Sequence, residues 1–130
     1  MKIQQELEDA VELHDFKKIK LLLNNKNVNP SAHKNWMIIH AAENGKLEIF
    51  KLFLNDPRVD PSDYRNYAIC MAAKNGHTNI VKLLLNDKRV DPSDRMNKTL
   101  QAASENGYTD IVNLLLEDKR VNPADNANPC

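Results

Sequence analysis

The string "NDPRVDPSD" fills residues 55–63, and it returns as "NDKRVDPSD" at 86–94 and as "EDKRVNPAD" at 117–125. A weaker copy, "NKNVNPSA", fills residues 25–32. Each copy holds a valine that is followed two residues later by a proline. Successive valines are 31 residues apart, and they are Val28, Val59, Val90 and Val121. A fixed interval of this length predicts an array of supersecondary units, each of which stacks on the next.

The segments between these strings predict two helices in each unit. The first segment reads "NWMIIHAA", "NYAICMAA" and "NKTLQAAS" in successive units, and the second reads "KLEIFKLFL", "HTNIVKLLL" and "YTDIVNLLL". Apolar residues recur at i, i+3 and i+4 in the second segment, which is the pattern of one helix face. An Asn-Gly pair stands between the segments, and glycine readily adopts the positive φ that ends a helix. Each unit therefore reads as helix, tight turn, helix.

The proline-containing strings predict the connectors between units. Proline has no N–H and disfavours the α conformation at the residue before it, so the connector cannot continue the second helix. Asn35, Asn66 and Asn97 stand just before the first helix of a unit and suit an N-cap. The valine of each string is expected to pack under the connector. Arg58, Arg89 and the neighbouring aspartates predict a solvated ridge, whose exposed pairs contribute only ~0–1 kcal/mol each.

Small residues recur where the first helices of neighbouring units meet. They are Ala41, Ala42, Ala72, Ala73 and Ala103. Alanine allows helices to approach closely, so stability is expected to come from stacking between units rather than from one helix pair alone.

Composition limits the classes of protein and partner. The chain has 130 residues, of which 42% are hydrophobic and 28% charged, as in an ordinary single globular domain. Lysine plus arginine equals aspartate plus glutamate, at 18 each, so no net field favours nucleic acid or an acidic membrane. No apolar run approaches the ~18–20 residues of a membrane span. The N-terminal segment lacks the apolar core of a signal peptide, and we expect a cytoplasmic protein.

Residue patterns for catalysis or metal binding are absent from the sequence. His14, His33, His40 and His77 have no Cys, Asp or Glu at metal-ligand spacing. Cys70 is expected to be a small apolar residue of a helix. The sequence contains no G-x-G-x-x-G, P-loop or G-x-S-x-G motif. We therefore expect no enzyme activity, no catalytic residue, no cofactor and no metal.

The strings "AAENGKLEIFKLFL" and "AAKNGHTNIVKLLL" resemble the ankyrin repeat, and the resemblance recurs in phase over residues 3 to 125. It implies an all-α solenoid of stacked helix-turn-helix units with short β-turn or hairpin-like loops. Two features differ from the family pattern: the step is 31 residues rather than ~33, and the Thr-Pro-Leu-His opening of the inner helix is absent. The "DPRVDPS" loop resembles ankyrin arrays encoded by amoebae and giant viruses.

The resemblance divides the chain, residues 1–130, into one domain of several units. They are a capping helix pair at 1–28, repeats at 29–59, 60–90 and 91–121, and the start of a further repeat at 122–130. The helix pair 99–116 is then expected to leave an open stacking face. Leu100, Leu114 and Leu115 should be partly exposed on it and give weak self-association. Two interpretations remain open: the chain was cut from a longer array, or another chain covers this face.

Positions that differ between units are free of the packing demands of the repeat. In the family, loop tips and inner helices line a concave groove that grips a partner protein. Aromatic residues, arginine and methionine are enriched at interface cores. The partner-binding candidates are His33, Lys34, Trp36, Tyr64, Arg65, Tyr67, Lys74, Arg95, Met96 and Lys98. The alternative is that Trp36 and Tyr67 only pack along the inner helices and that Met96 is neutral surface.

Three functions fit this sequence. The first is a protein–protein interaction module, a non-catalytic scaffold whose partner is not identified by the sequence. The second is a structural spacer within a longer repeat array, which would have bland loop tips rather than aromatic and basic ones. The third is a designed or reconstructed repeat protein without a natural partner, which would have nearly identical repeats. The repeats of this chain drift at many surface positions.

Overall fold

The computed structural model describes residues 2–120, except for the side chain of Met96. These residues form helices and connectors and contain no strand, so the all-α prediction is confirmed. The helices are α1 (Lys2–Glu12), α2 (Phe16–Leu23), α3 (Ala32–Glu43), α4 (Leu47–Leu54), α5 (Asp63–Lys74), α6 (Thr78–Leu85), α7 (Met96–Glu105) and α8 (Thr109–Glu117). The predicted start of a further repeat at 122–130 lies outside the described residues. None of the helices within 2–120 has the length and apolar character needed to cross a membrane.

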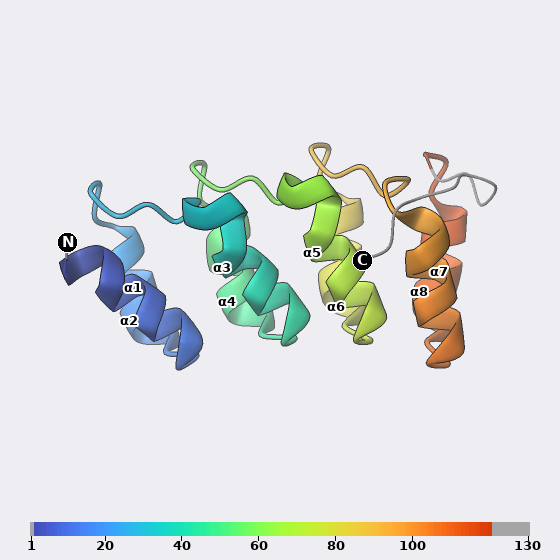
Figure 1. The fold of residues 1–130 in the computed structure, drawn as a ribbon, viewed down its shortest axis with the longest axis horizontal. Helices are drawn as coiled ribbons and strands as arrows, with labels where there is room; N and C mark the ends of the chain where they lie inside the picture. Colours follow the sequence, from blue (N-terminus) through green and yellow to red (C-terminus); the bar gives the residue numbers. More distant parts are fainter. Residues whose placement is uncertain (1, 121–130) are drawn as a thin grey trace.

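Helix pairs stand side by side in a row, as Figure 1 shows. The inner helices α1, α3, α5 and α7 contact one another in sequence, and so do the outer helices α2, α4, α6 and α8. The connectors run along one edge of the row, and the tight turns lie at the opposite edge (Figure 1). This arrangement is the predicted solenoid of helix-turn-helix units.

The core is continuous through the row. Phe50 and Phe53 of α4 are fully buried, as are Leu84 of α6 and Ile111 of α8. The alanines predicted to lie at the contacts between inner helices are at most 1% exposed, in agreement with close packing: they are Ala41, Ala42, Ala72, Ala73 and Ala103. Three of the connector valines are buried as predicted, at 3% exposure for Val28 and 2% for Val59 and Val90, and Val121 lies outside the described residues.

A left-handed turn precedes the right-handed part of α3 and of α5. Residues 33–35 have φ angles of 53°, 59° and 60°, and residues 64–66 have φ angles of 58°, 56° and 58°. The backbone N–H of Asn35 donates to the carbonyl oxygen of Ser31 at 3.1 Å, which closes the first of these turns. Left-handed conformation costs about 1–2 kcal/mol for each residue with a side chain. The loop tips are therefore fixed in a strained conformation.

The prediction that Asn35 and Asn66 are N-caps is wrong. Asn35 is 4% exposed, and its side-chain oxygen accepts from the backbone N–H of Asp60 at 2.9 Å. Its amide nitrogen donates to the Asp63 carboxylate at 2.9 Å. Asn66 accepts from the N–H of Asp91 at 2.9 Å in the same way. Because the left-handed turn aims these amides away from their own helices, they bind the connector of the next unit instead.

The third predicted N-cap is wrong as well, because Asn97 lies within α7 rather than before it. Arg95, two residues earlier, holds the capping position, with a φ of 60°. The helix α7 therefore begins two residues later in its unit than α3 and α5 begin in theirs.

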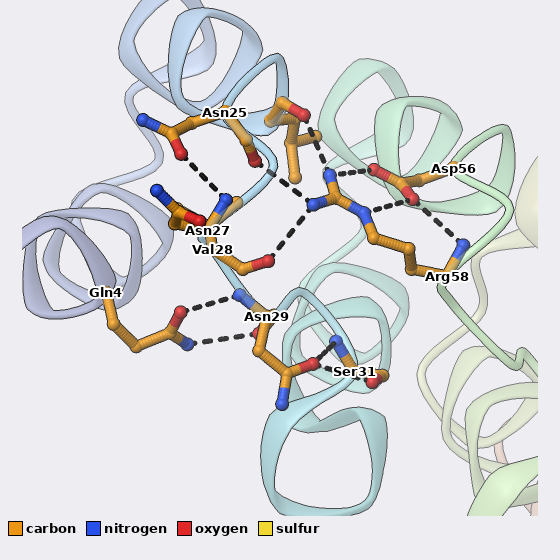
Figure 2. A network of polar contacts seen from close by, with 9 residues as sticks. Gln4, Asn25, Asn27, Val28, Asn29, Ser31, Asp56 and Arg58 are labelled. Carbon is orange, nitrogen blue, oxygen red and sulfur yellow. Dashed lines mark hydrogen bonds and ion pairs between the residues drawn. The ribbon is translucent and has the colours of Figure 1, made fainter.

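The connector arginines form the predicted ion pairs with aspartate, partly exposed, but they also bind the preceding unit. Arg58 and Asp56 form an ion pair of 2.7 Å within their own connector (Figure 2). The same guanidinium donates to the carbonyl oxygens of Leu23, Asn25 and Val28 at 2.7, 3.1 and 3.0 Å. Those carbonyls belong to the preceding unit. The arginine therefore joins two units through backbone oxygens, which charge-pattern reasoning did not foresee.

The arginine contact repeats along the row. Arg89 donates to the carbonyl oxygen of Val59 at 2.9 Å, and Arg120 donates to those of Val90 and Leu85, both at 2.8 Å. Hydrogen bonds from the arginines hold the pKa values of their partner carboxylates below the ordinary range; these carboxylates are Asp56, Asp87 and Asp118. We call each Asp-Arg pair, with the carbonyls it reaches, a connector clamp.

The exposure predicted for the last helix pair is partly wrong. Leu115 is fully buried, because it follows Ile111 by one helical turn and shares its inward face. Leu116 is 48% exposed instead. Leu100 and Leu114 are half-buried, as expected.

Candidate functional site

A cleft of about 390 Å³ lies between the tips and inner helices of two neighbouring units. It is lined by His33, Lys34, Trp36, Ile39, Tyr64 and Tyr67. All of these except Ile39 are predicted partner-binding candidates. Ile39 follows Trp36 by three residues and shares its helix face. Ile39 is a candidate that sequence reasoning missed, although the equivalent residues Cys70 and Gln101 show that this position varies between units.

The α3 wall of the cleft is supported by two histidines. The Trp36 ring meets the His40 ring edge-on, with centroids 5.6 Å apart and an interplanar angle of 80°. The His40 ring in turn stacks on His14 of the α1–α2 turn, again at 5.6 Å. Burial, followed by the charges of Lys46 and His40, lowers the pKa of His14. The His40 ring thus supports the Trp36 indole, which also lines the cleft.

The α5 wall is a pair of tyrosines. The rings of Tyr64 and Tyr67 meet edge-on, with centroids 5.1 Å apart and an interplanar angle of 71°. Tyr64 is 47% exposed, whereas Tyr67 is half-buried. Edge-to-face pairs of this kind contribute about 0.5–1.5 kcal/mol beyond their buried area. Tyr64 is therefore held in place despite its exposure.

Arg95 supports the tyrosine pair from the next unit. It is only 9% exposed, and its guanidinium carbon lies 5.7 Å from the Tyr64 centroid and 5.4 Å from that of Tyr67. Its Nε donates to the carbonyl oxygen of Arg65 at 3.0 Å. Arg95, one of the predicted partner-binding candidates, therefore lies mostly buried behind the tyrosine pair. Arg95 fixes the residues that line the cleft.

The rim of the cleft is cationic. The Lys34 ammonium lies 5.1 Å from the Tyr64 ring centroid, so it reaches from one unit across to the next. His33 beside it is exposed. Arg65, which follows Tyr64 but does not line the cleft, pairs with Asp94 at 2.9 Å and keeps half of its side chain exposed. Cation–π contacts at exposed sites contribute about 0.5–1 kcal/mol.

The remaining candidates do not line the cleft. Lys74 ends α5 and Lys98 lies in α7, and both are exposed. Met96 begins α7, and its side chain lies outside the described part of the structure. Within residues 2–120, no three His, Cys, Asp or Glu side chains are grouped as a metal would require.

A second cleft, of about 550 Å³, lies at the tight-turn edge of the first two units. Phe16, Leu47 and Ile49 line it together with Lys46 and Glu48. Leu13 of the neighbouring turn is 77% exposed. This cleft has charges of both signs at its edge and no group of aromatic residues.

Two overlapping segments of the chain, residues 7–93 and 38–126, match the family described as ankyrin repeats in three copies. No curated protein and no solved structure matches the chain in the corresponding comparisons.

Proposed function

The chain belongs to the ankyrin-repeat family, and we propose that it binds a partner protein through the concave face of its loop tips and inner helices. Ankyrin repeats are generally protein–protein interaction modules and generally non-catalytic. We propose the cleft between α3 and α5 as the centre of the interface. The repeats at 29–59 and 60–90 supply its walls, the repeat at 91–121 supplies Arg95 as a support, and the pair at 1–28 acts as a cap.

The observation that carries this proposal is the aromatic lining of the cleft. Trp36, Tyr64 and Tyr67 stand at positions whose residue differs between units, and each contacts a further ring or cation that fixes it. Tryptophan, tyrosine and arginine dominate the binding energy of protein interfaces. A structural spacer would not require such residues around an open cleft.

Backbone conformation supports the same face. The cleft residues His33, Lys34 and Tyr64 all have left-handed φ angles, between 53° and 59°. Strain of this kind clusters at functional sites, where the rest of the fold fixes it. A fixed loop loses little conformational entropy on binding, which favours affinity.

A capture experiment tests the proposal. The chain is immobilised and exposed to cell lysate beside two variants: Trp36→Ala with Tyr64→Ala in the cleft, and Lys51→Ala with Lys82→Ala and Asn113→Ala on the outer helices. We expect the outer-helix variant to capture the same proteins as the unaltered chain and the cleft variant to lose them. Loss of capture by the outer-helix variant alone would place the interface on the opposite face.

A further inference from the structure

We propose that the cleft between α3 and α5 binds an extended peptide segment that contains proline and carries carboxylates beside it. The inference rests on the proposed binding function and specifies the partner of the same site. It follows from the polar groups of the cleft walls, from the charges at the rim and from the size of the cleft.

Three polar groups of the walls can donate hydrogen bonds and have no partner among residues 2–120. The Trp36 indole N–H and the hydroxyl groups of Tyr64 and Tyr67 form no hydrogen bond with any other residue of the described part of the chain. Indole and ammonium groups can only donate, and a tyrosine hydroxyl readily does so. A ligand that fills this cleft must therefore supply acceptors next to apolar surface.

Proline-rich backbone has this chemistry. A prolyl residue offers a carbonyl oxygen and an apolar ring but no N–H. Pro-rich segments adopt an extended left-handed helix before they bind, and they dock into aromatic-lined grooves at low entropic cost. Trp36 on one wall and the tyrosine pair on the other match the requirements of such a segment.

The charges at the rim select carboxylates. The Lys34 ammonium lies at the cleft, 5.1 Å from the Tyr64 ring centroid. Arg65, the next residue after Tyr64, keeps half of its side chain exposed. The nearby carboxylates already accept hydrogen bonds: Asp63 from the Asn35 amide at 2.9 Å and Asp94 from Arg65 at 2.9 Å. The charged groups at the rim that remain able to bind a partner are therefore cations. Residues of the partner on either side of its prolines should be Asp or Glu.

A cationic ligand does not fit, although three aromatic rings surround the cleft. Two cations already lie near the Tyr64 ring, the Lys34 ammonium at 5.1 Å and the Arg95 guanidinium at 5.7 Å. A lysine or methylated lysine from a partner would meet both charges at short range. Like charges in contact disfavour binding, so the aromatic lining serves apolar contact and hydrogen bonding.

The size of the cleft limits the ligand to a short segment. A volume of about 390 Å³ is near the lower end of the ~300–1,000 Å³ range of ligand pockets. It suits a few residues of extended chain rather than the broad face of a helix. We therefore expect specificity to lie in a short motif of the partner.

Fluorescence titration tests the inference directly, because Trp36 is the single tryptophan of the chain. The probe is a blocked peptide of four prolines with a glutamate at each end. One control peptide replaces the prolines by alanine, and another replaces the glutamates by lysine. We expect a saturable change in Trp36 emission, with a Kd about tenfold lower for the Glu-Pro peptide than for either control.

A matched variant tests the role of the donors. Tyr64→Phe with Tyr67→Phe keeps both rings and removes both hydroxyl groups. We expect an unchanged urea midpoint and a Kd for the Glu-Pro peptide about tenfold higher. The control variant Lys82→Ala, on the outer face of α6, should bind like the unaltered chain.

Three results would overturn the inference: equal affinity for the alanine peptide, tighter binding of the lysine peptide, or no binding of any of the three. The broader proposal fails separately, when lysate capture survives substitution of Trp36 and Tyr64. Loss of capture in that variant without binding of the Glu-Pro peptide would leave the interaction face in place and reject proline recognition.

Discussion

The guanidinium of Arg58 lies 2.7 Å from the carbonyl oxygen of Leu23, the last residue of a helix in the preceding unit. The contact satisfies one of the carbonyl groups that a helix leaves without a partner at its C-terminal end. It also brings a positive charge to the negative end of the helix dipole. One side chain thereby ends the second helix of one unit and fixes the connector of the next.

Arg58→Lys tests this connector clamp. Lysine keeps the charge but cannot bind Asp56 and several carbonyls at once, because it lacks the planar fork of arginine. We expect the free energy of unfolding to fall by about 1–2 kcal/mol, near the lower end for charged hydrogen bonds because the site is partly exposed. Urea denaturation measures it. Lys88→Ala, in the equivalent connector, is the control and should change stability by less than ~0.5 kcal/mol.

Acid should weaken all of the clamps together. Hydrogen bonds from arginine depress the pKa values of Asp56, Asp87 and Asp118 below the ordinary value of 3.8. A depressed carboxyl pKa contributes stability that is present above the unfolded value and is lost as pH falls through the folded value. We therefore expect the urea midpoint to drop steeply below pH ~4.

A triple variant distinguishes the contribution of the connector clamps to acid unfolding from that of the other carboxylates. Asp56→Asn, Asp87→Asn and Asp118→Asn together should lower stability at neutral pH and reduce its decline between pH ~5 and ~2.5. Parallel pH profiles of the variant and the unaltered chain would show that other groups control acid unfolding.

Gly45 and Gly107 form a matched pair for the close contact between turns. Both have left-handed φ angles, 69° and 77°. A Cβ on Gly45 would lie 2.5 Å from the His77 ring, whereas a Cβ on Gly107 would meet nothing within 4 Å. The His77 ring cannot retreat without loss of its 2.9 Å hydrogen bond to the carbonyl oxygen of Glu43.

Alanine substitution at the two sites should distinguish the cost of backbone strain from the cost of the steric contact with His77. Gly107→Ala should cost about 1–2 kcal/mol, from the left-handed conformation alone. Gly45→Ala should cost about 1–3 kcal/mol more, from the overpacked contact with His77. Urea midpoints of the two variants decide the comparison, and equal losses would mean that His77 does not pack against this turn.

Periodicity was sufficient to predict the helix pairs, the buried valines and the alanine contacts, because each follows from a residue's place in its own unit. The roles of Asn35 and Arg58 were not predictable in this way. The backbone groups that they bind lie 25 or more residues away in sequence, and local rules for caps and charges consider only nearby partners. Stacking brings those partners together, so the tertiary contact replaces the local one.

The residues of the cleft were largely predictable, because they depart from the repeat pattern instead of following it. Its lining residues vary between units, and variation within a fixed repeat identifies positions that packing does not determine. Arg95 followed the same pattern but is buried, because Tyr64 and Tyr67 of the preceding unit cover it. The left-handed turns were also missed, because Lys34, Tyr64 and Arg65 have no intrinsic preference for positive φ.

Lys34 provides the test that connects this strain to the cleft. It holds a φ of 59° while its ammonium lies over Tyr64. Lys34→Gly and Lys34→Val both remove the ammonium, so the loss of the cation–π contact is the same in each. Glycine adopts a positive φ without penalty, whereas a β-branched residue is most strained there. We expect the free energy of unfolding of Lys34→Gly to lie within ~0.5 kcal/mol of that of the unaltered chain. Relief of about 1–2 kcal/mol of backbone strain offsets the lost cation–π contact and the greater conformational entropy that glycine loses on folding. Lys34→Val should be less stable than Lys34→Gly by about 1–2 kcal/mol in urea denaturation. Equal stability of the two variants would show that the tip is not left-handed in solution, and the fixed rim proposed for the cleft would then be wrong.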